Sequence, residues 1–254
     1  MALLKTNIYS DVLNMDTHVT VILPHDITHS KSPAKVLYLL HGLSDDSSKW
    51  TRYTALERKI YGKNIAVVMP EVQRSFYRDM HYGINYFQFI AYELPELCKN
   101  MFNISDKRED NFIAGLSMGG YGALKTAFTR TDLFSKVASF SGAVGFKKSL
   151  EEETFYDIYN KEKAKELVAI YGDDLIFPDD EDPFFLSKKV LDEKCAPDLL
   201  ITCGTEDFLY QDNIKLKEHL ENIGYNFTFL EWEGAHNWKF WDESLDHLLE
   251  FLGV

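Results

Sequence analysis

The feature that most constrains this chain is the stretch 111–125, NFIAGLSMGGYGALK. It begins as an apolar run, passes through GLSMG centred on Ser117, and continues with residues that favour a helix. A strand that turns sharply into a helix exposes a hydroxyl at its tip and needs small residues on both sides of it. A chance match to Gly-x-Ser-x-Gly in an ordinary turn is the simpler alternative. Because the strand and helix flank it correctly, the stretch predicts Ser117 as a nucleophile.

Apolar runs and helical patterns alternate along the rest of the chain. Residues 6–23 have the pattern of an antiparallel strand pair. Apolar runs at 34–42 and 64–71 are typical of strands buried on both faces, and further strands are predicted at 111–117, 136–143, 198–204 and 226–234. Helical spacing is found at 50–64, 86–102, 118–130, 211–222 and 237–253, with Pro95 predicting a kink or boundary. The alternation predicts an α/β fold, with a mostly parallel eight-stranded sheet and helices on both faces.

Residues 142–198 interrupt this alternation. They contain a helix-like segment at 151–172 and an acidic, proline-interrupted segment at 173–185. Long insertions in compact domains are usually functional, so we expect a cap-like element over one end of the sheet. A length of 254 residues is common for one α/β domain, and we therefore expect a single domain over residues 1–254.

A nucleophilic serine needs a base that takes its proton, and in this architecture the base is a histidine that comes last in the chain. His219, His236 and His247 follow Ser117. His219 and His247 fall inside predicted helices, where surface or packing roles are commoner. His236 lies on the loop after the last strand, at the edge where ligands gather in α/β sheets. The sequence predicts His236 as the general base.

The acid that orients the histidine should lie between the serine and the histidine in the chain. The segment CGTEDFLYQDN follows the penultimate strand and offers Glu206, Asp207 and Asp212. Asp212 enters the next helix as a predicted cap. Asp207 lies just past the strand end and is our choice, with Glu206 as its rival.

Two backbone amides are predicted to bind the oxyanion of the tetrahedral intermediate. One belongs to Met118, directly after the nucleophile, and the other to Leu43, in the loop after the strand that ends at His41-Gly42. His41 precedes the nucleophile in the chain, and the base role is already filled, so we interpret it as structural. No step of this chemistry needs a metal or cofactor, and we predict none.

Composition narrows the function further. A formal net charge of −13 argues against nucleic acid, whose phosphates need a basic surface. The start MALLKTNIYS lacks the pattern of a secretory signal, and no apolar run reaches the roughly 18 residues of a membrane span. Cys98, Cys195 and Cys203 suggest reduced thiols rather than a disulfide framework. We expect a soluble cytoplasmic protein.

The acidic residues 173–182 lack a calcium-loop pattern and predict a solvated face.

Aromatic residues offer two sets of candidates for a substrate pocket. Large apolar side chains on a loop need a reason to be there, so the loop before Tyr86 is the preferred set: Phe76, Tyr77, Met80 and Tyr82. The second set is Trp50, Trp238 and Trp241, for which packing is the favoured interpretation because aromatics beside a sheet are mostly core.

Five segments in the same order resemble the esterase D / tributyrin-esterase-like family of α/β-hydrolases, a group related to feruloyl and acetyl xylan esterases, S-formylglutathione hydrolases and mycolyltransferases. They are LYLLHGLSDDSSKW, FYRDMHYGINYFQFIAYELPEL, AGLSMGGYGALK, CGTEDFLY and EGAHNWKFWDESL. The resemblance covers nearly the whole chain. It implies an α/β-hydrolase fold, the site residues named above, and self-association as a fair expectation.

The predicted function is a serine carboxylesterase acting on small-molecule esters of short acyl chains, acetyl to butyryl, with aryl and acetylated-sugar esters as further candidates. The alternatives are an acyltransferase, a thioesterase of the S-formylglutathione type, and a catalytically silent binding protein. Leu116 stands before the serine where formylglutathione hydrolases typically carry histidine, which argues against that thioester. The resemblance does not name the physiological substrate.

Overall fold

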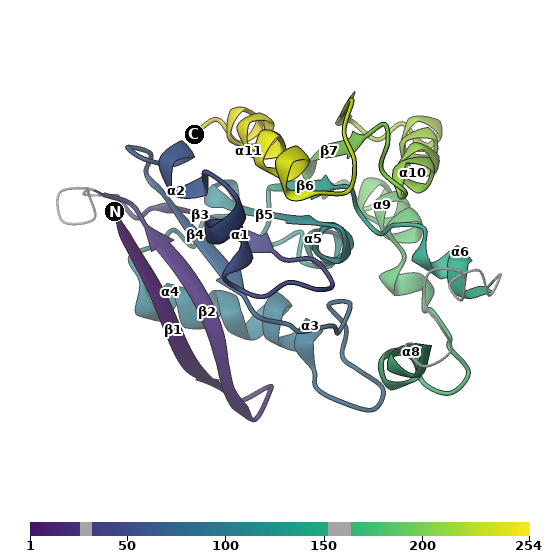
Figure 1. The fold of residues 1–254 in the computed structure, drawn as a ribbon, viewed down its shortest axis with the longest axis horizontal. Coiled ribbons are helices and arrows are strands. Elements are labelled where there is room, and N and C mark those ends of the chain that lie inside the picture. The colour runs from purple at the N-terminus through teal and green to yellow at the C-terminus, as the bar shows by residue number, and fades with distance from the viewer. Residues whose placement is uncertain (26–31, 152–163) are drawn as a thin grey trace.

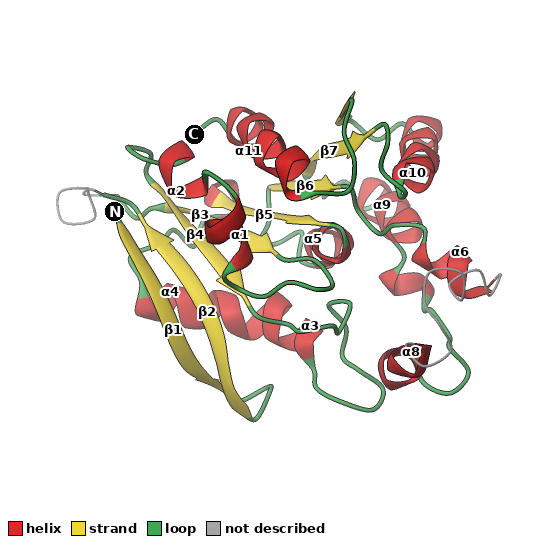
Figure 2. Cartoon of the chain, in the orientation of Figure 1, coloured by secondary structure: helices red, strands yellow, loops and turns green. Residues whose placement is uncertain are grey.

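The computed structural model describes residues 1–25, 32–151 and 164–254. Its strands are β1 (Ala2–Ser10), β2 (Met15–Leu23), β3 (Lys35–Leu40), β4 (Ile65–Pro70), β5 (Asn111–Leu116), β6 (Lys136–Phe140), β7 (Asp198–Gly204) and β8 (Phe227–Trp232). They form one sheet in the order β1-β2-β4-β3-β5-β6-β7-β8. The pairs β1/β2 and β2/β4 are antiparallel and the others are parallel. The prediction of an eight-stranded, mostly parallel sheet with helices on both sides is confirmed (Figure 2).

The helices cover the sheet on two faces. In chain order they are α1 (Lys49–Tyr53), α2 (Leu56–Lys59), α3 (Tyr86–Gln88), the π-helix η1 (Phe89–Glu93), α4 (Leu94–Met101), the 3-10 helix η2 (Arg108–Asp110), α5 (Met118–Thr129), α6 (Phe146–Glu151), α8 (Ala164–Tyr171), the 3-10 helix η3 (Asp179–Glu181), α9 (Pro183–Asp192), α10 (Tyr210–Ile223) and α11 (Trp238–Leu252). In Figure 1, α1, α2 and α11 lie on one side of the central strands, and α4 and α5 lie on the other.

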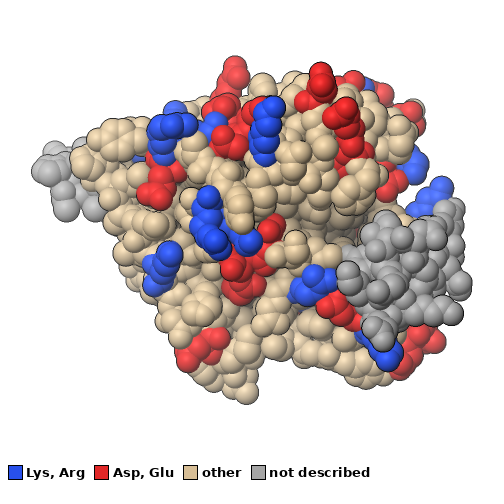
Figure 3. Space-filling model, viewed as in Figure 1, with Lys and Arg blue, Asp and Glu red and all other residues tan. Residues whose placement is uncertain are grey.

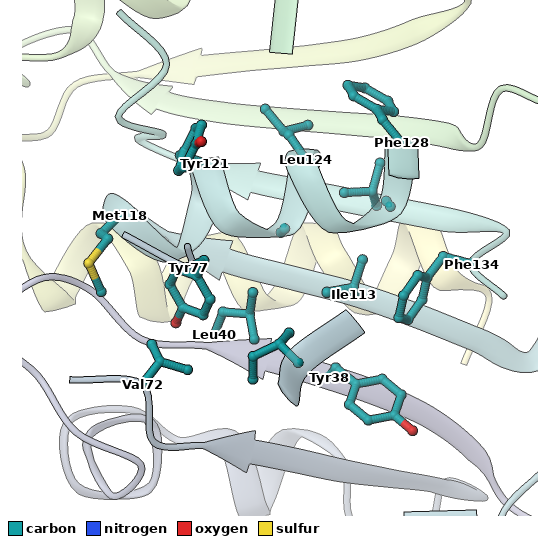
Figure 4. Close-up of a cluster of buried hydrophobic side chains, with 14 of the residues drawn as sticks. Tyr38, Leu40, Val72, Tyr77, Ile113, Met118, Tyr121, Leu124, Phe128 and Phe134 are labelled. Carbon is teal, nitrogen blue, oxygen red and sulfur yellow. The ribbon is translucent and has the colours of Figure 1, made fainter. Parts of the chain in front are cut away.

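Alternation along the central strands explains this arrangement. Successive side chains of a strand point to opposite faces. In β3, Val36, Tyr38 and Leu40 enter the cluster that also contains side chains of α4, α5, α9 and α10. Leu37 and Leu39 enter the other cluster, with α1, α2 and α11. Figure 4 shows the first cluster, where side chains of α5 meet those of the sheet. The apolar runs predicted as strands buried on both faces are therefore the central layer of the molecule.

Two predicted helices differ in detail. The predicted helix 50–64 is wrong as one unit, because Thr54 is extended (φ −129°, ψ 169°) and separates α1 from α2. The Ala55 N–H donates to Asp242 Oδ1 at 2.7 Å, which ties the break to α11. In the predicted helix 86–102, the five π-helical residues of η1 come directly before α4, whose first turn contains Pro95. Pro95 thus lies at the boundary between the two helix types, where its missing N–H is tolerated.

Part of the inserted segment 142–198 lies beside α5 and α10. It contributes α6, α8, η3 and α9, whereas its residues 152–163 are outside the described structure. Helix α9 packs against α5 and α10. Near the end of α8, the carbonyls of Ala169 and Ile170 accept from the N–H groups of Tyr82 and His81 at 2.9 and 3.1 Å. The insert is thus joined to the loop that follows β4.

None of the helices in the described part of the chain combines the length and the apolar character that crossing a membrane requires.

Candidate active site

Ser117 occupies the sharp turn between β5 and α5. Its backbone has φ 53° and ψ −118°, a conformation that costs energy for a residue with a side chain. A Cβ added to Gly115 would lie 2.3 Å from the Gly119 carbonyl oxygen, and one added to Gly119 would lie 2.6 Å from the His41 carbonyl oxygen. Gly115 therefore allows β5 and α5 to approach closely enough to form the turn, and Gly119 allows the start of α5 to lie against the end of β3.

Ser117, His236 and Asp207 lie in one hydrogen-bonded chain. His236 Nε2 is 3.0 Å from Ser117 Oγ, and His236 Nδ1 is 2.8 Å from Asp207 Oδ2 and 3.0 Å from Asp207 Oδ1. An ionised carboxylate only accepts hydrogen bonds, so Nδ1 carries the proton and Nε2 is left to accept from the serine hydroxyl. This geometry meets the requirement for an activated serine: a base within reach of the hydroxyl and a third group that orients the base.

The loops that carry Asp207 and His236 are held against each other by backbone contacts. The Glu206 N–H donates to the Gly234 carbonyl at 2.9 Å. A Cβ on Gly204 would lie 2.2 Å from that same carbonyl oxygen, so the approach requires glycine. Directly after His236, the Asn237 side chain caps α11 by accepting from the N–H groups of Lys239 and Phe240. The glycines of CGTEDF and EGAHNW are thus the sequence signal for the close approach of these two loops, which the sequence alone did not lead us to predict.

Asp207 is held in its ionised form. Burial by itself raises the pKa of this carboxyl, but hydrogen bonding and charge from His236, the Leu209 N–H and the Ser141 hydroxyl together lower the pKa below its ordinary value. The Leu209 N–H donates to Oδ1 at 2.8 Å. Because the lowered pKa keeps Asp207 charged at neutral pH, this carboxylate favours a positive charge on the neighbouring His236 imidazole.

The rival candidates lie elsewhere. Glu206 is exposed and lines a separate hollow beside Lys239 and Glu243. The prediction of Asp212 as the cap of α10 is wrong, because Leu209 occupies the N-cap position and Asp212 lies in the first turn, where its carboxylate pairs with Lys215 at 2.7 Å. The two helical histidines are also occupied: His219 Nε2 lies 2.9 Å from the Phe184 carbonyl, and the His247 ring contacts Trp232.

The predicted oxyanion donors both line the cavity beside Ser117. The N–H of Leu43 shares a peptide plane with the carbonyl of Gly42, so whatever fixes that carbonyl also aims the amide. His41 Nδ1 lies 2.8 Å from the Gly42 oxygen, and the Asp45 N–H donates to it at 3.2 Å. His41 is only 1% exposed, and its Nε2 accepts from the Val72 N–H at 3.2 Å. The geometry gives His41 a structural task, which is to orient the peptide that carries one predicted donor.

The cavity at Ser117 has a volume of about 450 Å³. Asp45 is one of its few charged groups, and burial raises the pKa of this carboxyl. Most of its wall is apolar, formed by Phe76, Leu116, Phe146, Phe208, Trp238 and Trp241. The cavity is therefore a largely apolar chamber that contains the Ser117 hydroxyl.

The predicted pocket residues are only partly found there. Phe76 lines the cavity, and Phe146 of the insert stacks on it at 4.6 Å between ring centroids. Tyr77 belongs to the core, as Figure 4 shows, and its hydroxyl donates to the His41 carbonyl at 2.9 Å. Met80 lines a second cavity with Glu166, and Tyr82 is exposed and donates to Asp173 at 2.6 Å.

The prediction of a cavity-lining role is therefore wrong for Tyr77, Met80 and Tyr82. Phe76 and Tyr77 both have positive φ, 51° and 52°, and this local turn directs their side chains in a way that residue type does not reveal. For the tryptophans, the expectation of packing holds for Trp50, which is wholly buried, but Trp238 and Trp241 also form part of the cavity wall.

The acidic segment 173–182 is not a uniformly solvated face. Glu181 forms ion pairs with Arg78 at 2.7 Å and with Lys125 at 3.1 Å, and Asp182 caps α9. The prediction of a solvated surface is therefore wrong at these two positions. In the described ranges, no three His, Cys, Asp or Glu side chains gather in a way that could hold a metal ion.

Fold and site together define an α/β-hydrolase with a serine at the strand-to-helix turn, and the comparisons place the chain within this class. A family model described as "Putative esterase" matches residues 10–252. An acetyl esterase from Caldicellulosiruptor saccharolyticus is 32% identical, with 99% of this chain and 98% of the relative covered. The chain belongs to this esterase family and is a carboxylic ester hydrolase.

Two solved structures from Staphylococcus aureus show the same fold. The fluorophosphonate-binding serine hydrolase F, in a substrate-bound form, has a TM-score of 0.87, and an S-formylglutathione hydrolase has a TM-score of 0.86. Each is 35% identical to this chain, with 99% of this chain and 98% of the solved chain covered.

Proposed function

We propose that this protein is a serine carboxylesterase that hydrolyses short-chain acyl esters, acetyl to butyryl, through an acyl-enzyme on Ser117. The observation that carries the proposal is the chain of contacts from Asp207 through His236 to Ser117, at 2.8 and 3.0 Å. The similarity to an acetyl esterase along the whole chain supports a small acyl group.

In the proposed mechanism, His236 Nε2 takes the hydroxyl proton while Ser117 Oγ attacks the ester carbonyl carbon. Asp207 holds the imidazole by its Nδ1–H and balances the positive charge. The oxyanion forms between the amides of Leu43 and Met118, and the Met118 amide also lies at the partly positive end of α5. His236 then gives its proton to the departing alcohol, and water, activated by the same histidine, releases the acid.

The short-acyl preference rests on the size of the chamber. A cavity of about 450 Å³ lies toward the lower end of typical small-molecule sites and must receive acyl and alcohol portions together. Trp238 limits its extension on one side, because this ring packs on Trp50, Tyr53 and Trp241 at centroid distances of 5.2, 5.4 and 5.3 Å. A long acyl chain would have to leave the cavity for solvent.

The direct test is Ser117→Ala with p-nitrophenyl acetate as substrate. Loss of the nucleophile is expected to reduce kcat by about 10³-fold or more, because only binding and oxyanion stabilisation remain. Hydrolysis at the wild-type rate by a folded Ser117→Ala protein would end the proposal. A series of p-nitrophenyl esters from acetate to decanoate tests chain length, with rates predicted to fall beyond butyrate.

A thioesterase of the S-formylglutathione type is a second candidate, favoured by the solved structure of that name at 35% identity. Leu116 argues against this thioester activity. It is, however, only one of the residues that line the cavity. Assaying S-formylglutathione beside p-nitrophenyl acetate separates the two. Acyl transfer to an added sugar or thiol is checked by analysing the products of the same reactions.

The cytoplasmic location and self-association stay predictions.

A further inference from the structure

Phe208 is an unusual surface residue. Its ring is 65% exposed, yet it forms part of the cavity wall and lies 4.5 Å from the His236 imidazole, centroid to centroid. The residues before and after Phe208 in the chain fix its position. Asp207 precedes it with a wholly buried carboxylate, and the N–H of Leu209 after it donates to that carboxylate at 2.8 Å. Because this ring lines the same cavity as Ser117 and is held beside His236, it lies where a bound ester can contact it.

The chemistry of the reaction determines which part of an ester lies near this ring. In acylation the Ser117 Oγ bond to the carbonyl carbon forms, the bond from that carbon to the alcohol oxygen breaks, and the serine proton passes through His236 Nε2 to the alcohol oxygen. The alcohol oxygen must therefore come within hydrogen-bond distance of Nε2. The oxyanion turns the other way, toward the amides of Leu43 and Met118. The alcohol portion is thus the part of the ester that lies on the His236 side.

We propose that Phe208 is a specificity-determining residue that binds the alcohol portion of the ester, favouring aryl and other bulky apolar alcohols over small ones. The inference rests on the proposed function. Contact between the Phe208 ring and an apolar leaving group removes apolar surface of both from water. Aromatic groups gain further from stacked or edge-on geometry. Because the ring is exposed, the subsite is open and does not limit the length of the alcohol.

The experiment compares Phe208→Ala with wild type on two substrate series. One holds the acyl group as acetyl and changes the alcohol from ethyl to benzyl, and the other holds p-nitrophenol and changes the acyl group from acetyl to butyryl. Loss of one aromatic contact corresponds to a reduction of about 5- to 20-fold in kcat/KM for benzyl acetate. Ethyl acetate is expected to lose less than about 3-fold, since it has little surface to place on the ring. Phe208→Tyr, which keeps the ring, should retain the benzyl preference.

In the acyl series, the ratio of wild type to Phe208→Ala should be the same for acetyl, propionyl and butyryl. The matched control is Phe185→Ala on α9, where a phenylalanine is 49% exposed away from the cavity. It should change neither series. Thermal unfolding of each variant confirms that the fold is retained.

Two outcomes would overturn the assignment. One is an equal loss for ethyl and benzyl acetate, which would give Phe208 only a general supporting role. The other is a loss that grows with acyl length, which would place the ring against the acyl chain. Both outcomes are distinct from failure of the proposed function, in which Ser117→Ala would remain active on every substrate.

Discussion

At the scale of single residues, Ser117 shows how the surroundings maintain a strained backbone. Its N–H donates to the Phe140 carbonyl at 2.9 Å, and its carbonyl accepts from the N–H groups of Tyr121 and Ala143 at 3.1 and 3.0 Å. These contacts fix the residue on β6 and α5 from both sides. A conformation with positive φ persists in a residue with a side chain only where the structure around it allows no other.

Asp207→Asn is expected to lower kcat by about 10³- to 10⁴-fold with a small effect on KM, because an amide at this position allows His236 to adopt the wrong tautomer. Steady-state kinetics with p-nitrophenyl acetate measure the change. Asp212→Asn is the matched control, since that carboxylate pairs with Lys215 on α10 and should be removable with little effect. Near-wild-type turnover by Asp207→Asn would transfer the acid role to another group.

The residues of the hydrogen-bonded chain were predictable because the chemistry fixes their order along the sequence. The cavity wall was not, because it depends on where each side chain points. Tyr77 follows Phe76 directly, yet Phe76 faces the cavity and Tyr77 enters the core below α5. Phe208 was also missed, although it directly follows the predicted acid. Its proximity to Asp207 was the available signal.

At the scale of elements, the approach of α5 to the end of β3 is a packing constraint that can be tested. Gly119→Ala places a Cβ 2.6 Å from the carbonyl oxygens of Leu40 and His41, both of them backbone atoms that cannot move aside. Overpacking of this kind costs about 1–3 kcal/mol, and we expect a lower free energy of unfolding together with reduced activity. Urea denaturation and steady-state kinetics measure the two effects.

Gly83→Ala is the control for this prediction. The three atoms nearest to a Cβ there are side-chain atoms of Met80 at 3.0 to 3.2 Å, with no backbone atom among them, so the loss of stability and activity should be smaller than in Gly119→Ala. Wild-type stability in Gly119→Ala would show that the close approach is not required.

Arg74 joins the insert to the loop that carries Leu43. Its guanidinium bonds both carboxylate oxygens of Glu166 on α8, at 2.7 and 2.8 Å, and its Nη1 donates to the Leu43 carbonyl at 3.3 Å. Half-exposed ion pairs contribute little stability, so Arg74→Gln should leave the unfolding temperature nearly unchanged while reducing kcat by about 2- to 5-fold. A stopped assay at saturating substrate measures the effect.

Glu166→Gln is expected to produce a smaller reduction in the same direction, because Arg74 would keep its bond to Leu43 but lose its fixed orientation. The matched control is Lys188→Gln, which breaks the exposed pair of Lys188 with Asp192 on α9. If Arg74→Gln and Lys188→Gln behave alike, the insert has no influence on this loop.

Element positions followed from the sequence where the apolar pattern was long and regular. The central strands were predicted within a few residues because their side chains alternate between two buried faces. The break at Thr54 was not predicted, because it depends on a contact with Asp242, which is far away in the chain. The contacts of the insert with α5 and with the loop after β4 could not be predicted from local sequence patterns either, because the partners are distant in sequence.

At the scale of the whole molecule, the balance of charge is acidic, with a formal net charge of −13. On the face shown in Figure 3, basic side chains are interspersed among acidic ones. Among the buried charged residues is Lys125 on α5, which pairs with Glu181 at 3.1 Å, donates to the Tyr77 carbonyl at 3.2 Å and lies over the Phe87 ring at 4.2 Å. Together with Arg78, these groups connect α5, the loop after β4 and the insert.

Burial lowers the pKa of Lys125 from 10.5 to about 8, although Glu181 acts in the opposite direction. Below pH 8 the amine is charged in both the folded and unfolded states, and its burial opposes folding. Between pH 8 and 10.5 the folded protein releases this proton while the unfolded chain retains it, so this group's contribution to the free energy of unfolding rises with pH.

Lys125→Met should remove this contribution. We predict that the difference in free energy of unfolding between wild type and Lys125→Met shifts in favour of wild type as pH rises from 8 to 10.5. Urea denaturation across this range measures it, and the comparison cancels the titration of other groups. A difference that does not change with pH would mean that Lys125 titrates normally in the folded protein.

The central claim, that Ser117 is the nucleophile of this site, is tested most directly by covalent labelling. The protein is titrated with a fluorophosphonate probe, the residual hydrolysis of p-nitrophenyl acetate is measured at each point, and the labelled residue is located by peptide mass spectrometry. We predict a single label on Ser117, with activity falling in proportion to its occupancy. Full activity in protein labelled completely at Ser117, or inactivation by a label on another residue, would contradict the account.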